Sequence, residues 1–232
     1  MLRNILVPVD GSKLAERALL LAVPLADQHN ATLTLISVHE PIPEITLGGG
    51  APARDPALDH KWRSDHHAYL TKLAKRVGRR TTASVQVEFL DGKIVPTLAQ
   101  YATEHAVDLI VMCTHGRGGF QRLWMGSVAD GLARRTTVPL LLARGGRATG
   151  TRMLQDPVFR RVLVPLDGSV RSEGALKHVL ALIGSGPGAI TLAHVVHPMM
   201  VAAAVRRAET PAEDVRANYL APLAARFRRD RI

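Results

Sequence analysis

Residues 107–143 read VDLIVMCTHGRGGFQRLWMGSVADGLARRTTVPLLLA, and this stretch decides the fold. Its first part, residues 107–112, is almost wholly apolar, which is typical of a strand buried on both faces of a parallel sheet. Residues 114–119 then supply a hydroxyl, an imidazole, an Arg and three glycines. The pattern predicts a polar, glycine-bearing turn at the carboxyl end of a buried strand.

The same stretch continues with a helix and a second strand. In residues 127–135 the apolar side chains fall on one helical face, and Ser127 is the expected N-cap. Residues 138–143 form another apolar run. Strand, glycine loop, helix and strand in this order present backbone N–H groups and a positive helix end to an anion such as phosphate.

An internal repeat sets the domain organisation. ILVPVDGS at residues 5–12 recurs as VLVPLDGS at 162–169, an offset of 157, and two later matches follow in the same order. They are residues 31–38 with 189–196 and residues 69–76 with 219–226. The repeat predicts a complete domain over residues 1–145, a linker over 146–157 and an incomplete second domain over 158–232, with strand, helix, strand and helix only.

The first copy alternates strands and helices. Residues 40–56 hold four prolines and three consecutive glycines, and are expected to be a loop. Five strands alternating with helices predict an α/β fold in three layers, with a parallel sheet and right-handed crossovers. Before the opening stretch, the expected strands are 4–9, 32–38 and 84–90, and the expected helices are 13–28, 57–77 and 94–105.

Composition excludes several classes of protein. With 47% hydrophobic and 22% charged residues, the chain of 232 residues has the balance of a soluble globular protein. No apolar run reaches the length of a membrane span, and no signal-peptide pattern is visible at the start. The single cysteine, Cys113, permits no internal disulfide. A cytoplasmic location is therefore expected.

The net charge of +10 does not identify a nucleic-acid-binding protein. The excess is spread, with +4 in residues 1–145 and +6 in residues 146–232, and 24 of the 30 basic residues are Arg. Zinc-finger spacing and an aromatic RNA platform are missing from the sequence, and aromatic residues make up only 4%. A solvated basic surface is the preferred interpretation.

Taken together, these motifs resemble the universal stress protein family. The matching segments are NILVPVDGS at 4–12, THGRGG at 114–119, and GSVAD at 126–130 ahead of Val138-Pro139. The resemblance covers the first copy and the front half of the second, as in a tandem member whose second domain is short. It implies a Rossmann-like sheet of order 3-2-1-4-5, adenine-nucleotide binding in one branch of the family, and pairing of domains, within a chain or in a homodimer, along the strand at 138–143.

The implied sheet order indicates where a ligand would bind. In open α/β sheets, ligands occupy the crevice beyond the carboxyl ends of the strands, where the winding direction reverses. With the order 3-2-1-4-5, this reversal lies between the first and fourth strands, which end at residues 9–10 and 112–113. Both are places where polar turns interrupt apolar runs.

The resemblance also implies the site residues. The family's nucleotide motif is glycine, two residues, glycine, nine residues, glycine, and then Ser or Thr. Gly116, Gly126 and Ser127 match it, whereas Cys113 stands at the first glycine and places a sulfur near the ligand. ATP is the implied ligand, with or without Mg²⁺, for which the sequence holds no dedicated carboxylate cluster. The implied contacts are Pro8, Val9, Asp10 and Val38 with the adenosine, Met112 and Cys113 under the ribose, and His115, Gly116, Arg117, Gly126, Ser127 and Val128 with the phosphates.

Two functions from different classes stay open. The first is an adenine-nucleotide-binding regulatory module in a stress response. The second is an interaction or dimerisation module that binds no nucleotide, because Cys113 has made the site degenerate.

An enzyme has less support in the sequence. A Walker lysine loop and a nucleophile elbow are both missing, and no general base is clearly placed, so slow ATP hydrolysis is the most that is expected. His60 and the run Asp65-His66-His67 hold potential metal ligands. Adjacent histidines on a helix point about 100° apart, so these residues are interpreted as a polar helix face.

Overall fold

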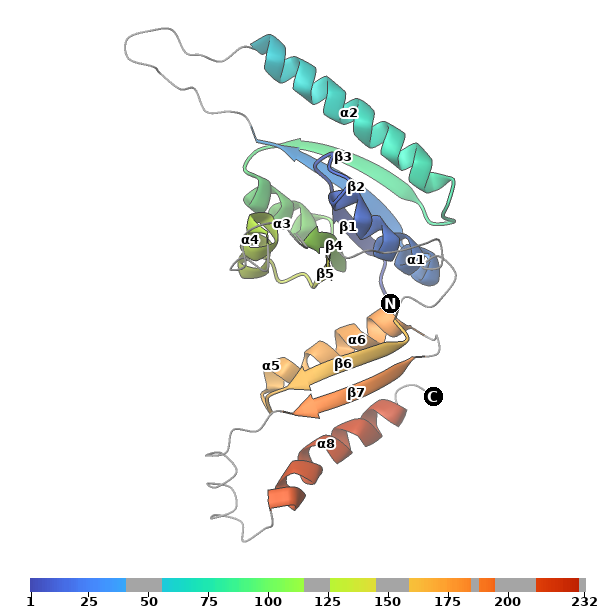
Figure 1. Cartoon of the computed structure of the whole chain (residues 1–232), viewed down its shortest axis with the longest axis vertical. Helices are drawn as coiled ribbons and strands as arrows, with labels where there is room; N and C mark the ends of the chain where they lie inside the picture. Colours follow the sequence, from blue (N-terminus) through green and yellow to red (C-terminus); the bar gives the residue numbers. More distant parts are fainter. Residues whose placement is uncertain (41–55, 115–125, 145–158, 185–187, 195–211, 230–232) are drawn as a thin grey trace, which may run out of the picture. The chain divides into compact units, whose positions relative to one another are not determined.

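The computed structural model, shown in Figure 1, describes residues 1–40, 56–114, 126–144, 159–184, 188–194 and 212–229. The chain divides into two compact units, Met1–Asp156 and Pro157–Ile232. Among the described residues, no helix combines the length and the apolar character that crossing a bilayer requires.

The first unit contains one five-stranded sheet of order β3-β2-β1-β4-β5, with all neighbouring strands parallel. The predicted fold class, an open Rossmann-like sheet with this order, is confirmed. The elements in chain order are β1 (Asn4–Pro8), η1 (Ala15–Ala18), α1 (Leu19–His29), β2 (Thr32–His39), α2 (Pro56–Gly78), β3 (Val85–Asp91), α3 (Ile94–Glu104), β4 (Leu109–Thr114), α4 (Ser127–Arg135) and β5 (Leu140–Arg144).

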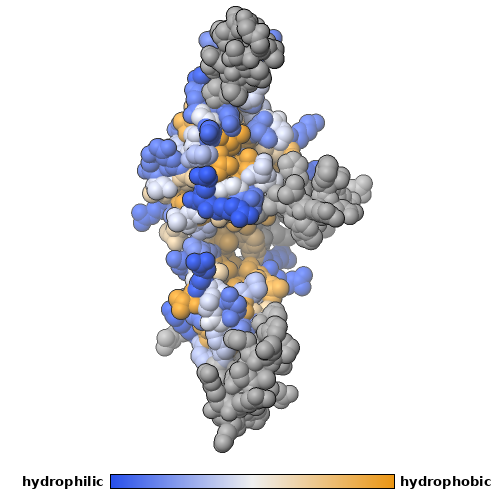
Figure 2. Space-filling view, turned by 90° about the vertical axis from the view of Figure 1, so that its left-hand side faces the viewer, coloured by the Kyte–Doolittle hydropathy of each residue, from blue (hydrophilic) through white to orange (hydrophobic). Residues whose placement is uncertain are grey.

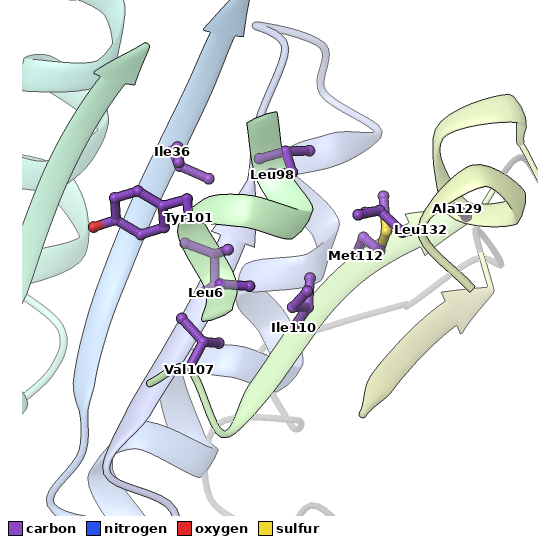
Figure 3. Packing of buried hydrophobic residues seen from close by; sticks show 10 residues of the cluster. Leu6, Ile36, Leu98, Tyr101, Val107, Ile110, Met112, Ala129 and Leu132 are labelled. Carbon is purple, nitrogen blue, oxygen red and sulfur yellow. The ribbon is translucent and has the colours of Figure 1, made fainter. Parts of the chain in front are cut away.

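The central strands are apolar on both faces because helices cover both faces. Leu6 of β1 and Ile110 of β4 are fully buried in a cluster with residues of α3 and α4, as Figure 3 shows. Neighbouring side chains on a strand point to opposite faces, so Ile5 and Val7 lie on the other face, where α1 packs on the sheet. This two-sided burial explains why the strands read as continuous apolar runs.

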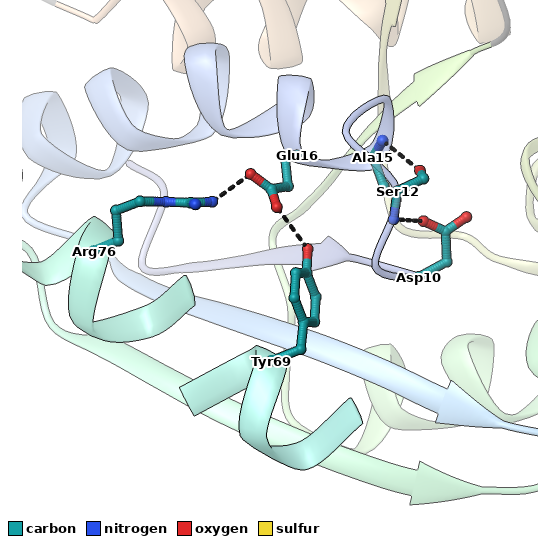
Figure 4. Close-up of polar contacts among 6 residues, drawn as sticks. All are labelled: Asp10, Ser12, Ala15, Glu16, Tyr69 and Arg76. Atoms are coloured by element: carbon teal, nitrogen blue, oxygen red, sulfur yellow. Dashed lines mark hydrogen bonds and ion pairs between the residues drawn. The ribbon is translucent and has the colours of Figure 1, made fainter. Parts of the chain in front are cut away.

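A tight turn connects β1 to the first helical segment. Gly11 has φ +84°, a left-handed conformation that glycine adopts without steric cost. The backbone N–H of Ser12 donates to Asp10 Oδ1 at 2.9 Å, and the N–H of Ala15 donates to Ser12 Oγ at 3.1 Å, as drawn in Figure 4. The polar turn expected after the first strand is confirmed, and Ser12 Oγ accepts from the N–H of the first residue of η1.

Several predicted boundaries were wrong by a few residues. The fourth strand occupies Leu109–Thr114 rather than 107–112, because residues 106–108 complete the preceding turn. Ala106 has φ +46°, the N–H of Val107 donates to Ala102 O at 2.9 Å, and Asp108 Oδ2 accepts from the N–H of Arg3 at 2.6 Å. The fifth strand begins at Leu140 rather than at residue 138. The first helical segment, expected to start at residue 13, begins at Ala15 with the 3-10 helix η1.

The second unit repeats the first half of this fold. Its elements are β6 (Arg161–Leu166), α5 (Val170–Glu173), α6 (Ala175–Ile183), β7 (Ala189–His194) and α8 (Ala212–Arg229), and β6 pairs with β7 in parallel. Val164, Leu166 and Leu176 form a buried cluster in its core. Hydrophobic residues also reach its surface, as Figure 2 shows, and Leu163 is 65% exposed. Residues 41–55 of the expected loop, and the expected linker at 146–157, lie outside the described residues.

Candidate functional site

The switch point of the sheet lies between β1 and β4. These two strands pair over only two positions, and Leu6 opposite Ile110 is the last of them. Beyond it, β1 runs on to Pro8 beside β2, and β4 runs on to Thr114 beside β5. The central strands therefore stop pairing before their carboxyl ends, at the place where the winding reverses and where ligands bind in sheets of this kind.

Asp10 is the acidic residue at this place. It follows β1 directly and is exposed. Its Oδ1 accepts the hydrogen bond from the N–H of Ser12. Within the described residues, Oδ2 accepts no hydrogen bond. The turn thus holds the carboxylate in a fixed orientation and leaves one oxygen for a ligand.

Cys113 lies across the switch point, near the end of β4, and is half-buried. Burial raises the pKa of its thiol, an effect that the Arg17 guanidinium of η1 partly offsets. The thiol is therefore protonated at neutral pH and is a poor nucleophile. Among the described non-glycine residues only Asn30 and Ala106 have positive φ, so Cys113 has an ordinary strand backbone. Its side chain adds bulk beside the site without straining the chain.

The apolar candidates mostly belong to the core. Val9 is 5% exposed and Met112 is 8% exposed, and Met112 packs against α4 in Figure 3. Val38 and Val128 pack, partly buried, against the same cluster. Pro8 is partly exposed at the end of β1. A ligand at the switch point would therefore meet Val9 and Met112 mainly through their backbone atoms.

The amino terminus of α4 carries the remaining described candidates. Gly126, with φ −58° and ψ 155°, is the N-cap, and Ser127 is the first helical residue, so the expected cap at Ser127 was wrong. Among the described residues, no side chain caps this terminus, and the first N–H groups of an α-helix have no partner within the helix. His115, Gly116 and Arg117 lie outside the described residues.

One side chain beside Asp10 escaped the sequence interpretation. His67 is exposed, as a polar helix face requires. His66 was wrongly included in that face, because its side chain is partly buried on the inner side of α2. A Cβ added at Gly11 would lie 3.9 Å from His66 Cε1, so the imidazole covers the turn that holds Asp10. The spacing of Trp62, His66 and Tyr69, four residues and then three, is the helical signal that could have found it.

Across the described ranges, no group of three or more His, Cys, Asp or Glu side chains is arranged to hold a metal ion.

Comparison with known proteins gives a single family. The family model described as "Universal stress protein family" matches residues 1–144 and 159–228. A universal stress protein of Mycobacterium tuberculosis is 30% identical over 175 residues, which is 73% of this chain and 56% of the relative. The chain thus spans about half the length of the curated mycobacterial relatives that it matches.

Solved structures agree with this result. The universal stress protein UspA from Lactobacillus plantarum has a TM-score of 0.51 and 28% identity, covering 61% of this chain and 97% of that protein. A universal stress protein from Archaeoglobus fulgidus has a TM-score of 0.65 and 18% identity, covering 93% of this chain and 74% of the other. At that identity, the second comparison concerns the fold alone.

Proposed function

This chain belongs to the universal stress protein family, and on that premise we propose that its first unit is an adenine-nucleotide-binding regulatory module in a stress response. In this proposal, residues 1–145 are the complete domain, 146–157 are a linker and 158–232 are an incomplete second copy. The location expected from the single cysteine is cytoplasmic.

The observation that carries the proposal is the end of pairing between β1 and β4 at the switch point. Asp10 follows one strand and Cys113 lies near the end of the other, while α4 begins at Ser127. The free oxygen of Asp10 would accept hydrogen bonds from the hydroxyl groups of a ribose. Val38 and Pro8, both only partly buried, would border the adenine.

The phosphates would bind at the start of α4. Unpaired N–H groups and the positive end of the helix dipole favour a phosphate there. Gly126 has no Cβ to block the approach of the ligand, and Ser127 adds a hydroxyl. His115, Gly116 and Arg117, which the family motif places in the preceding loop, would complete the contacts. ATP, with or without Mg²⁺, is the proposed ligand.

Equilibrium dialysis with ATP tests the proposal. The wild-type chain is expected to bind saturably, and Gly126→Ala is expected to weaken binding about tenfold, because a Cβ would crowd the phosphate. Gly126 has a negative φ, so alanine fits its backbone. Cys113→Gly, which restores the glycine of the motif, is expected to tighten binding.

Gly78→Ala is the matched control for Gly126→Ala. A Cβ at Gly78 would meet nothing within 4 Å, and this residue ends α2. Its ATP affinity should equal that of the wild type. Absence of saturable binding at millimolar ATP would exclude the proposed ligand.

A dimerisation module is the second candidate function, and one observation favours it. β5 is an edge strand of the sheet, so one side of Leu140–Arg144 has no neighbouring strand within the described part of the first unit. A homodimer, or a pairing of the two units, would extend the sheet along this edge. In this alternative, analytical ultracentrifugation finds a dimer and dialysis finds no nucleotide.

Catalysis is not part of the proposal. Slow hydrolysis of ATP held near the loop is the most that we expect, and we assign no catalytic residue.

A further inference from the structure

α2 packs against β2 and β3, and one face of it lies beside the turn that follows β1. This face carries Asp59, Trp62, His66 and Tyr69, which are three or four residues apart and so share a side of the helix. Hydrogen bonds fix both ends of this stripe. Asp59 Oδ1 lies 2.6 Å from Nε2 of His39, a residue of β2 that is only 4% exposed.

The other end of the stripe is Tyr69. Its hydroxyl donates to Glu16 Oε1 at 3.0 Å, and Arg76 forms an ion pair with the same carboxylate, as Figure 4 shows. Between the two fixed ends, α2 has little freedom to rotate. His66 is therefore held at a defined place, one turn of the helix from Tyr69.

Packing, rather than hydrogen bonding, orients the His66 ring. The indole of Trp62 stacks on it with ring centroids 3.6 Å apart and an interplanar angle of 24°. The ring lies over the turn at Gly11, where an added Cβ would come within 3.9 Å of His66 Cε1. His66 Nδ1 is buried, and no described residue hydrogen-bonds to it.

The ionisable groups that face His66 come from three elements. They are Asp10 from the turn after β1, His39 from β2, and Asp65 from α2 itself. Burial lowers the pKa of His66, and His39 lowers it further, while Asp10 and Asp65 raise it. The ring is therefore neutral at pH 7.5. In acid it gains a positive charge close to the carboxylate of Asp10.

We infer that His66 is a positioning residue for Asp10: the neutral ring, braced by Trp62, supports the Asp10 turn for ligand binding, and the protonated ring draws the carboxylate away from the ligand. This inference rests on the proposed function. Ser12 occupies one oxygen of Asp10, so ligand and protonated His66 compete for the other. ATP affinity should consequently fall in acid through His66.

The experiment is equilibrium dialysis of the full chain with ATP at pH 7.5 and pH 5.5. Protonation of the ATP phosphate itself, with a pKa of about 6, affects all variants alike. The wild type should lose roughly fivefold more affinity between these pH values than His66→Asn, which cannot become charged. His67→Asn, which changes the exposed neighbour, should behave like the wild type.

Two results would overturn the inference. An equal loss of affinity in the wild type and His66→Asn would overturn the inference while leaving the proposed function intact. No ATP binding by the wild type at either pH would overturn the proposed function, and the inference with it. Far-UV circular dichroism checks folding, and His66→Gln, a second neutral replacement, is measured in the same way if His66→Asn does not fold.

Discussion

The first strand, turn, helix and second strand occur twice in this chain, and the two copies share their register. Asn4 pairs with Thr32 in the first unit, and Arg161 pairs with Ala189 in the second, so both partners keep the offset of 157. Their turns also agree, because Gly11 and Gly168 have φ +84° and +85°. The backbone of this segment thus follows from its local sequence.

The covering helices repeat one hydrogen bond as well. Tyr69 donates to Glu16 at 3.0 Å, and Tyr219 donates to Glu173 at 3.2 Å. Glu16 and Glu173 are again 157 residues apart. The helix that covers the strands, α2 or α8, is thus joined in the same way to the helical segment after the turn, η1 or α5.

The opposite face differs between the copies. Leu6 is fully buried beneath α3 and α4, whereas Leu163, the equivalent residue, is 65% exposed. In the described residues of the second unit, the register, the turn and the covering helices occur without counterparts of α3, α4, β4 and β5. In the first unit, α3 and α4 bury the face of the sheet that holds Leu6. Neither helix has a counterpart among the described residues of the second unit.

The largest expected effect comes from shortening the two equivalent leucines. Leu6→Ala should lower the free energy of unfolding of the first unit by about 2–5 kcal/mol, because it leaves a cavity in the core. Leu163→Ala should change the free energy of unfolding of the second unit by less than about 0.5 kcal/mol. Equal costs would mean that the outer face of β6 is covered in solution.

Urea denaturation can follow the units separately. Both tryptophans, Trp62 and Trp124, belong to the first unit. Tryptophan fluorescence therefore follows the unfolding of that unit and measures the effect of Leu6→Ala. Hydrogen exchange of the β6 amides reports on Leu163→Ala. The same exchange rates in Leu163→Ala and the wild type are the expected result.

A smaller effect, equal in both units, is expected at the turn glycines. Gly11→Ala and Gly168→Ala should each cost about 1–2 kcal/mol, because alanine is strained at positive φ. Space is not the reason, since an added Cβ would lie 3.9 Å from His66 and 3.7 Å from His194, respectively. Urea denaturation followed by far-UV circular dichroism checks both variants. A clearly larger cost in one unit would contradict the local origin of the turn.

The sequence was sufficient for the fold because the signals were local and repeated. Apolar runs identified the strands, and the helix at Ser127–Arg135 has the predicted bounds. The start of β4 was wrong because Val107 is apolar but closes the end of α3. Asp108, next to it, accepts hydrogen bonds from the backbone N–H groups of Arg3 and Asn4 at the start of β1. An apolar run does not by itself distinguish a strand from the cap before it.

The candidate site was less predictable, because it combines side chains from distant segments. Asp10 and Cys113 followed from the sheet order. His66 did not, since its importance depends on its place beside the turn at Gly11, 55 residues away in the sequence. In the second unit, His194 covers the corresponding Gly168 from β7 rather than from a helix. The helical spacing of Trp62, His66 and Tyr69 indicates that they share one face of α2, but it does not indicate that this face covers the turn.

The number of ATP molecules bound per chain tests the central claim most directly. Isothermal titration calorimetry should give one, because among the described elements only those of the first unit include both an aspartate turn and a helix equivalent to α4. Asp10→Asn should abolish this binding, while Asp167→Asn, the equivalent change in the second unit, should leave it unaltered. Undiminished binding in Asp10→Asn, or no binding in the wild type, would contradict the account.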